Sequence, residues 1–248
     1  MGSSGVRVDL RGGQALVTGG ARGLGAAIVR RLAGAGASVL VADVRKELAR
    51  ELCDELNGDG GDACFVELDV RDPDAVAGVF RELDGVGRAV DVLVNNAAVD
   101  VSKPIEHLTA DEVTRVVQTN LLGPVYLCLE AYRRMVARGG PHREHPVHGG
   151  QPHLDGGRPY AAGKTGLRAF THTLFKEAQR DCPGIGVTGI VAGGMETPFI
   201  MDRFPETDDV RCHSPDIVAD AVLYALSVPE GSVAGEIVVV PRREPSWP

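Results

Sequence analysis

The chain has 248 residues, of which 44% are hydrophobic, 24% are charged and 4% are aromatic, and its formal net charge is -8. This composition is typical of a globular protein, and the length suits one large α/β domain, so we predict a single domain over residues 1–248. The negative charge argues against nucleic acid as a partner, and no apolar run is long enough to span a membrane. Five scattered cysteines and an N-terminus without an apolar leader predict a cytoplasmic protein with reduced thiols.

Strands and helices alternate along the chain. We predict strands at residues 14–18, 38–42, 64–68 and 90–94, and helices at 25–35, 46–56 and 73–83. A long helix over 110–136, interrupted near Gly123, follows. Beyond Tyr160 we expect helices at 161–180 and 215–226 and strands at 186–191 and 235–240. This order predicts an α/β fold, a single doubly wound Rossmann-type domain whose parallel sheet of about seven strands carries helices on both faces.

A glycine-rich turn joins the first predicted strand to the first predicted helix. A backbone that closely approaches a pyrophosphate requires residues without Cβ, and the N-terminus of a helix supplies N–H donors and a partial positive charge. A tight structural turn is the simpler alternative, but the position at the first strand-to-helix junction favours a dinucleotide site. The candidate cofactor residues of this turn are Gly19, Arg22, Gly23, Leu24 and Gly25.

Polar residues follow three further predicted strands. Asp43 ends the second strand, 18 residues after Gly25, where an acid accepts hydrogen bonds from the adenosine ribose. Its charge repels a 2′-phosphate, so we expect NAD, with NADP less favoured, although Arg22 and Arg45 lie nearby. The other candidate cofactor residues at strand ends are Asp69, Val70, Asn96 and Ala97.

Tyr160 and Lys164 are four residues apart in a predicted helix and therefore lie on one face of it. A neighbouring ammonium favours the phenolate and lowers the tyrosine pKa toward the working pH. Tyr160 is therefore a candidate acid/base at a carbonyl or alcohol oxygen. An ordinary exposed helix pair is the alternative.

Five motifs together resemble the short-chain dehydrogenase/reductase family over almost the whole chain. They are Thr18-Gly19-xxx-Gly23-x-Gly25, Asp69-Val70, Asn95-Asn96-Ala97, Asn120 in Asn-Leu-Leu-Gly, and Tyr160-Ala-Ala-Gly-Lys164. The resemblance implies hydride transfer between NAD(H) and a small alcohol or carbonyl substrate, in a homotetramer or homodimer.

The resemblance also implies roles for individual residues. Tyr160 would be the catalytic acid/base, Lys164 would bind the nicotinamide ribose as well as tune Tyr160, and Asn120 would hold a water in a proton relay. Met195 and Thr197 would lie on the nicotinamide side, and residues 198–212 would form a substrate lid. No metal is expected.

The segment 137–159 departs from the family pattern. The family has a buried strand here, and a serine about thirteen residues before the tyrosine that hydrogen-bonds the substrate oxygen. In this sequence position 147 is a valine, and no serine occurs in the segment. The segment instead contains four histidines with many glycines and prolines, and we predict that the central fifth strand is lost. One interpretation is a polar loop in a catalytically impaired or non-catalytic dinucleotide-binding protein. A second, which we do not favour, is metal binding by the histidines.

The third interpretation, which we favour, is an out-of-frame reading over residues 140–157. Codons for Pro-His-Arg-Glu-His-Pro-Val-His can be chosen so that reading one base later gives Arg-Ile-Val-Asn-Ile-Pro-Ser. That is close to the missing strand, and its serine falls at Val147. The coding DNA tests this hypothesis directly, because only particular third bases allow the rereading.

Overall fold

A parallel sheet organises the part of the chain that the structure describes, residues 8–138, 147–148, 158–201 and 212–242 of a computed structural model. Its strands are β1 (Gln14–Thr18), β2 (Ser38–Asp43), β3 (Asp62–Glu67), β4 (Val92–Asn95) and β5 (Val147–His148), in the order β3-β2-β1-β4-β5. A separate parallel pair contains β6 (Gly189–Ala192) and β7 (Glu236–Val239). The strands predicted from the sequence are therefore present, with shifts of a few residues at their ends.

The prediction of one sheet of about seven strands is not confirmed, because the described strands divide into a set of five and a set of two. The predicted loss of the fifth strand is wrong in part, since β5 pairs with β4 through Val94–Val147 and Asn95–His148. Among the described residues, these are the two pairs that join β5 to β4. The remaining residues of the proposed out-of-frame segment lie outside the described part of the chain.

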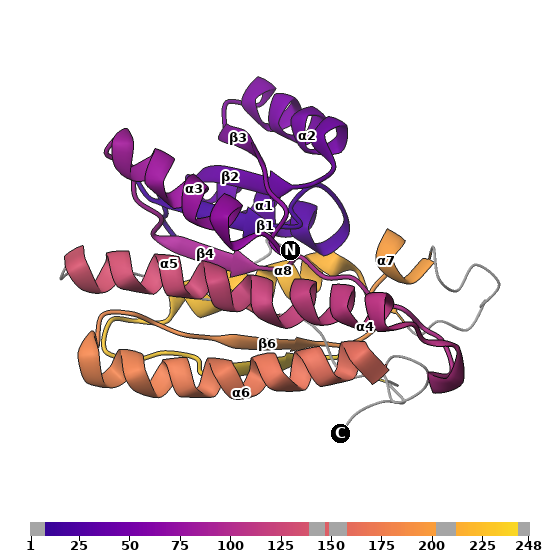
Figure 1. Cartoon of the computed structure of the whole chain (residues 1–248). Helices are drawn as coiled ribbons and strands as arrows, with labels where there is room; N and C mark the ends of the chain where they lie inside the picture. The colour runs from indigo at the N-terminus through magenta and orange to yellow at the C-terminus, as the bar shows by residue number, and fades with distance from the viewer. Residues whose placement is uncertain (1–7, 139–146, 149–157, 202–211, 243–248) are drawn as a thin grey trace.

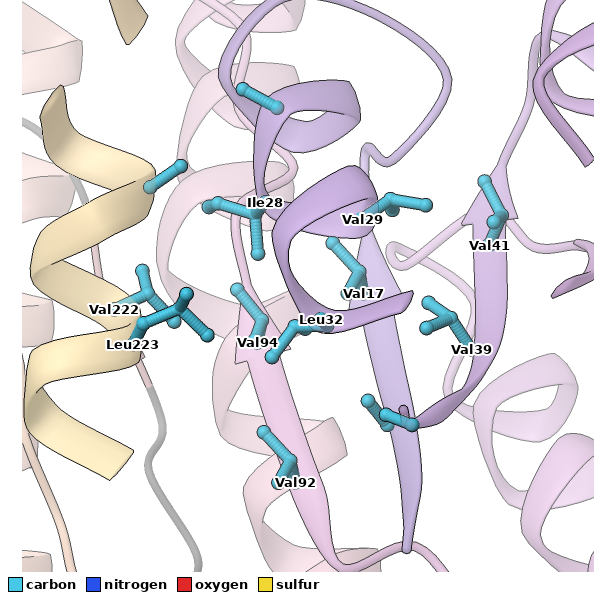
Figure 2. Close-up of a cluster of buried hydrophobic side chains, with 14 of the residues drawn as sticks. Val17, Ile28, Val29, Leu32, Val39, Val41, Val92, Val94, Val222 and Leu223 are labelled. Carbon is cyan, nitrogen blue, oxygen red and sulfur yellow. The ribbon is translucent and has the colours of Figure 1, made fainter. Parts of the chain in front are cut away.

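Helices cover both faces of the sheet, as predicted for a doubly wound fold (Figure 1). On one face, α1 (Gly23–Gly34) packs on β1 and β2, and α8 (Pro215–Ser227) packs against α1 and on β6 and β7. Figure 2 shows how Ile28 and Leu32 of α1 meet Val222 and Leu223 of α8 over the sheet valines. The helix α2 (Lys46–Gly58) adds Leu52 to the same core. Burial of these side chains stabilises this face, at roughly 1.5–3 kcal/mol for each large apolar residue.

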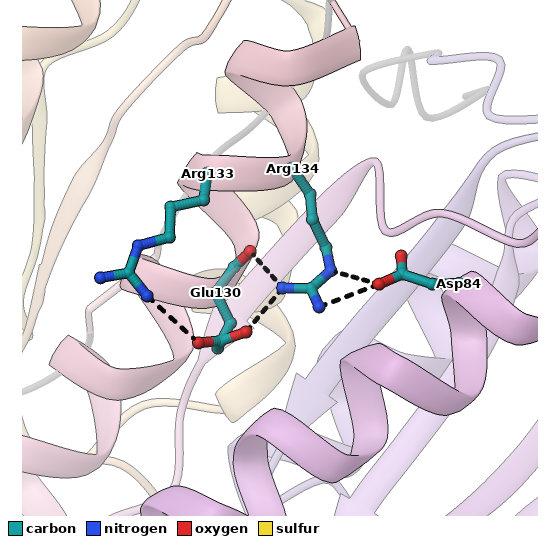
Figure 3. A network of polar contacts seen from close by, with 4 residues as sticks. All are labelled: Asp84, Glu130, Arg133 and Arg134. Carbon is teal, nitrogen blue, oxygen red and sulfur yellow. Dashed lines mark hydrogen bonds and ion pairs between the residues drawn. The ribbon is translucent and has the colours of Figure 1, made fainter.

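The opposite face is covered by α3 (Pro73–Gly85) and α5 (Gly123–Arg138), which enclose Phe80, Leu127 and Met135. An ion-pair network joins the two helices at its edge (Figure 3). The Arg134 Nε donates to Asp84 Oδ2 at 2.9 Å, and its Nη1 donates to Glu130 Oε2 at 2.6 Å. Partly exposed ion pairs contribute only about 0–1 kcal/mol each, so the network fixes the relative position of helices that apolar burial holds together.

The predicted long helix over 110–136 is divided into α4 (Ala110–Val117), a π-helical turn (Gln118–Leu122) and α5. A capping box starts α4, since Thr109 and Glu112 each accept a hydrogen bond from the other's backbone N–H. At the start of α5 a Cβ on Gly123 would lie 2.8 Å from Val70 Cγ2, so the glycine allows the helix to press against the end of β3. The predicted interruption near Gly123 is confirmed, and its cause is the extra residue of the π turn.

Three further helices complete the described chain. The predicted helix at 161–180 is α6 (Arg158–Asp181), which runs beside α4 and α5 (Figure 1). Two short helices were not predicted, a 3₁₀ turn at Ile105–His107 and α7 (Pro198–Met201). None of the helices in the described residues is both long enough and apolar enough to cross a membrane.

Candidate active site

The glycine turn between β1 and α1 is closed so tightly that side chains cannot enter it. Gly19 has a φ of +62°, and a Cβ on it would lie 2.8 Å from Ala97 Cα. A Cβ on Gly25 would lie 2.0 Å from the carbonyl oxygen of Gly19. Asn96 fixes the turn from the neighbouring strand, because its Nδ2 donates to the carbonyls of Thr18 and Gly19 at 3.0 and 2.9 Å.

The N-terminus of α1 opens from this turn without an acidic residue in its first turn. The partial positive charge of the helix end is therefore not countered by a nearby carboxylate of the same helix. Gly23, which begins α1, has a φ of +56° and faces Thr197, whose Cβ would be 3.3 Å from an added Cβ. The turn thus offers backbone donors and the contour that a pyrophosphate requires.

Asp43 stands at the end of β2 with only 2% of its side chain exposed. Its Oδ2 accepts from the backbone N–H of Ala21 at 3.1 Å, and its Oδ1 accepts from that of Arg45 at 2.9 Å. The Arg45 guanidinium lies 3.6 Å from Oδ1. A carboxylate has about four lone-pair sites, so two hydrogen bonds leave it able to accept from a diol.

One cavity of about 320 Å³ joins these features to Tyr160. It runs along the carboxyl ends of β1, β2 and β4, where ligands bind in open α/β sheets. Thirteen of the fifteen predicted site residues line it, and only Asn120 and Lys164 do not. The thirteen are Gly19, Arg22, Gly23, Leu24, Gly25, Asp43, Asp69, Val70, Asn96, Ala97, Tyr160, Met195 and Thr197.

Tyr160 lies in the first turn of α6, 9% exposed, in a small apolar cluster with Val101 and Val116. The Phe199 ring lies against it at a centroid distance of 6.0 Å and an interplanar angle of 44°. On the same helix, the Lys164 Nζ lies 5.6 Å from the Tyr160 ring centroid. The predicted juxtaposition of Tyr160 and Lys164 on one helix face is therefore present.

Lys164 is buried, with 6% exposure, and burial lowers its pKa from 10.5 to about 8. Between these values the folded chain binds fewer protons than the unfolded chain, so the free energy of unfolding rises with pH from about 8 to 10.5. Below pH 8 the buried ammonium destabilises the folded state by its full amount, about 3 kcal/mol.

Lys164→Met is therefore expected to raise the free energy of unfolding at pH 7, and this increase is expected to shrink toward pH 10. Urea unfolding of both proteins across this range is the measurement, and a gain independent of pH would contradict the assignment.

Asn120 lies in the π-helical turn, fully buried, and binds the loop after β4. Its Nδ2 donates to the carbonyl of Val99 at 2.7 Å, and its Oδ1 accepts from the N–H of Val99 at 2.9 Å. Both amide atoms therefore position Val99, which lines the cavity. The predicted role of Asn120 in a water relay stays a prediction.

Asp69, in the loop between β3 and α3, is engaged by Arg71. The guanidinium donates Nε to Oδ1 at 2.9 Å and Nη2 to Oδ2 at 2.5 Å, and this pairing holds the pKa of Asp69 below its usual range. Asp69 lines the cavity next to Val70. The sequence did not indicate that Arg71 neutralises it.

Comparisons with known proteins agree with this geometry. The family model described as short chain dehydrogenase matches residues 14–208. An uncharacterized oxidoreductase of Thermotoga maritima is 37% identical over 193 residues, which are 76% of this chain and 73% of that protein. The chain belongs to the short-chain dehydrogenase family.

Solved structures of other short-chain dehydrogenases have the same fold. A putative gluconate dehydrogenase from Agrobacterium tumefaciens superposes with a TM-score of 0.84, at 28% identity, over 95% of this chain and 97% of that one. A metagenomic short-chain oxidoreductase in complex with NADP superposes with a TM-score of 0.80, at 27% identity, over 94% of this chain and 98% of that one. This short-chain dehydrogenase is therefore an oxidoreductase.

Several residues of the dehydrogenase cavity were missed from the sequence. Arg71, Arg115, Thr119 and Phe199 line it together with the predicted residues. The spacing of Arg115 and Thr119 was a usable signal for one of its walls, because residues four apart share a helix face. Phe199 was expected only as part of the lid. Most of that lid, residues 202–211, lies outside the described part of the chain, as do three of the four histidines of the metal hypothesis, His142, His145 and His153.

Proposed function

We propose that this short-chain dehydrogenase transfers a hydride between NAD(H) and an alcohol or carbonyl substrate. The observation that carries the proposal is the single cavity that contacts the glycine turn, Asp43 and Tyr160. A cofactor bound along it would span from the end of β2 to the tyrosine. NAD(H), when bound, supplies or accepts the hydride, and the chain supplies position and electrostatics.

The cofactor end of the site supports a dinucleotide. The glycine turn and the N-terminus of α1 would bind the pyrophosphate through backbone N–H groups. Asp43 would accept hydrogen bonds from the adenosine ribose and repel a 2′-phosphate, which favours NAD over NADP. Arg45, 3.6 Å from Asp43, reduces that repulsion without removing it.

At the other end, Tyr160 would donate its hydroxyl proton to a carbonyl oxygen, or accept a proton from an alcohol. The Lys164 ammonium beside the ring stabilises the phenolate that remains. Because the pKa of Lys164 is about 8, this help is present below pH 8 and is lost above it. Binding of the nicotinamide ribose by Lys164, the placement of Met195 and Thr197 beside the nicotinamide, and a homotetramer or homodimer belong to the same proposal.

The test is a titration of the chain with NADH and with NADPH, followed by reduction of a panel of ketones. We expect the chain to bind NADH more tightly than NADPH. Asp43→Asn is expected to reduce this difference in affinity between the two nucleotides. In any background that turns over, Tyr160→Phe is expected to lower kcat by roughly 10²–10⁴-fold while NADH binding is retained. Absence of binding of both nucleotides would refute the proposal, and binding without turnover in any background would leave a nucleotide-binding protein without dehydrogenase chemistry.

A further inference from the structure

Arg115 is a cavity residue to which the proposed chemistry gives no role. It lies on α4, and its residue is exposed, yet it lines the same cavity as Asp43 and Tyr160. One turn further along the helix, Thr119 lines the cavity as well. One step beyond, past the π turn, Gly123 touches Val70. The same stretch of chain therefore brings Arg115 and Thr119 to the cavity and, at Gly123, meets the loop between β3 and α3.

The other charges near this wall are already paired. Arg45 lies beside Asp43, and Arg71 occupies both carboxylate oxygens of Asp69. On α4 itself, Glu112 is engaged by Lys103 at 2.5 Å. Within the described residues the Arg115 guanidinium makes no ion pair and no hydrogen bond, while the Arg115 carbonyl accepts from the Gln118 N–H and the Thr119 hydroxyl. A planar cation therefore borders the cavity without a protein partner in this part of the chain.

The chemistry of the surrounding wall indicates which part of a dinucleotide this cation would meet. The pyrophosphate belongs at the glycine turn, and the ribose at Asp43. The cavity lining also includes Val70, Ala97 and Thr119, whose small or apolar side chains suit a flat uncharged ring, beside the mutually paired Asp69 and Arg71. Guanidinium groups stack on π systems more readily than ammonium groups do.

We propose that Arg115 binds the adenine ring of the cofactor by stacking its guanidinium on the ring. The inference rests on the proposed dinucleotide site and adds to it a residue that acts on the base, not on the phosphates or the reacting atoms. Val70 and Ala97 would contact other sides of the ring, and Arg115 would cover it from α4.

Binding measurements on the full chain test the proposal without any need for turnover. Arg115→Ala is expected to weaken the binding of NADH and of AMP by the same factor, about tenfold, which lies between the values for an exposed and a desolvated cation on an aromatic face. Nicotinamide mononucleotide, which lacks adenine, is expected to bind equally to both proteins. Arg115→Lys is expected to recover little of the loss, because it keeps the charge but not the plane. Arg133→Ala, which removes an arginine with 68% side-chain exposure from α5, is the matched control and should leave all three affinities unchanged.

Each other outcome has a definite meaning. Unchanged NADH and AMP binding in Arg115→Ala would overturn the inference and leave the proposed function intact. If Arg115→Ala also weakened the binding of nicotinamide mononucleotide, Arg115 would lie at the reacting end of the cofactor. If it weakened NADPH binding more than NADH binding, Arg115 would be a phosphate ligand. Either result would overturn stacking on adenine. Failure of the unaltered chain to bind NADH and AMP would overturn both this inference and the proposed function.

Discussion

Replacing residues 140–157 by the reread segment, with Arg-Ile-Val-Asn-Ile-Pro-Ser ending at position 147, is expected to raise kcat for ketone reduction at least about 100-fold. That factor is typical for one hydrogen-bond donor on a reacting oxygen. The register supports the position, because Val147 pairs with Val94, one residue before the end of β4 at the cavity edge. A serine at 147 would therefore stand at the same edge of the sheet as the proposed site.

Three proteins separate the contributions to this effect. The chain as written, the reread version and Val147→Ser alone are compared by steady-state kinetics with the same ketones and NADH. The single substitution supplies the hydroxyl but not the strand, so we expect it to recover only part of the gain. Turnover by the chain as written at the rate of the reread version would refute the out-of-frame interpretation, and so would coding DNA that does not permit the rereading.

Among substitutions that add one methyl group to the nucleotide site, Gly25→Ala is expected to reduce stability and NADH affinity the most. The new Cβ would lie 2.0 Å from the Gly19 carbonyl oxygen and 2.7 Å from Asn96 Nδ2, so backbone must move. We expect a stability loss of about 3 kcal/mol or more, since overpacking against rigid atoms costs at least 1–3 kcal/mol. NADH affinity should fall more than about 100-fold, because the displaced turn is the proposed pyrophosphate site.

Gly34→Ala is the matched control, since it adds a methyl group to the last residue of the same helix, where no atom lies within 4 Å. We expect unchanged NADH binding and a stability equal to or up to about 1 kcal/mol above that of the unaltered chain. Urea unfolding and NADH titration of the two variants side by side make the comparison. Equal behaviour of Gly25→Ala and Gly34→Ala would show that the turn is not closed as described.

Local patterns in the sequence predicted the first half of the fold well. The strand at 14–18 and the helix starts at Lys46 and Pro73 agree with the structure because short-range signals determine them: a fully apolar run, an amphipathic repeat, and an Asp72 cap with proline after it. The glycine turn was predictable for the same reason, since a missing Cβ is visible in the sequence.

Features that depend on contacts between distant segments were not predictable. The split of the strands into five and two depends on how β5 pairs, and the pairing of Asn120 with Val99 depends on where a π turn places one amide. Arg71 and Arg115 reach the cavity because two different segments converge on the end of β3. Neither arginine belongs to a motif, so its location is known only once the segments are packed.

The packing of α8 on α1 has a consequence for the gene as well as for the protein. Ile28 and Leu32 are covered by Val222 and Leu223, which are translated almost two hundred codons later. If translation shifted frame near residue 140 and never shifted back, the product would lack α8. The apolar side chains of α1 would then be exposed, which favours aggregation and proteolysis. In the out-of-frame hypothesis, a second, compensating shift before Tyr160 keeps α8 in the reading frame. The hypothesis is therefore compatible with the complete core that α1 and α8 form in the structure.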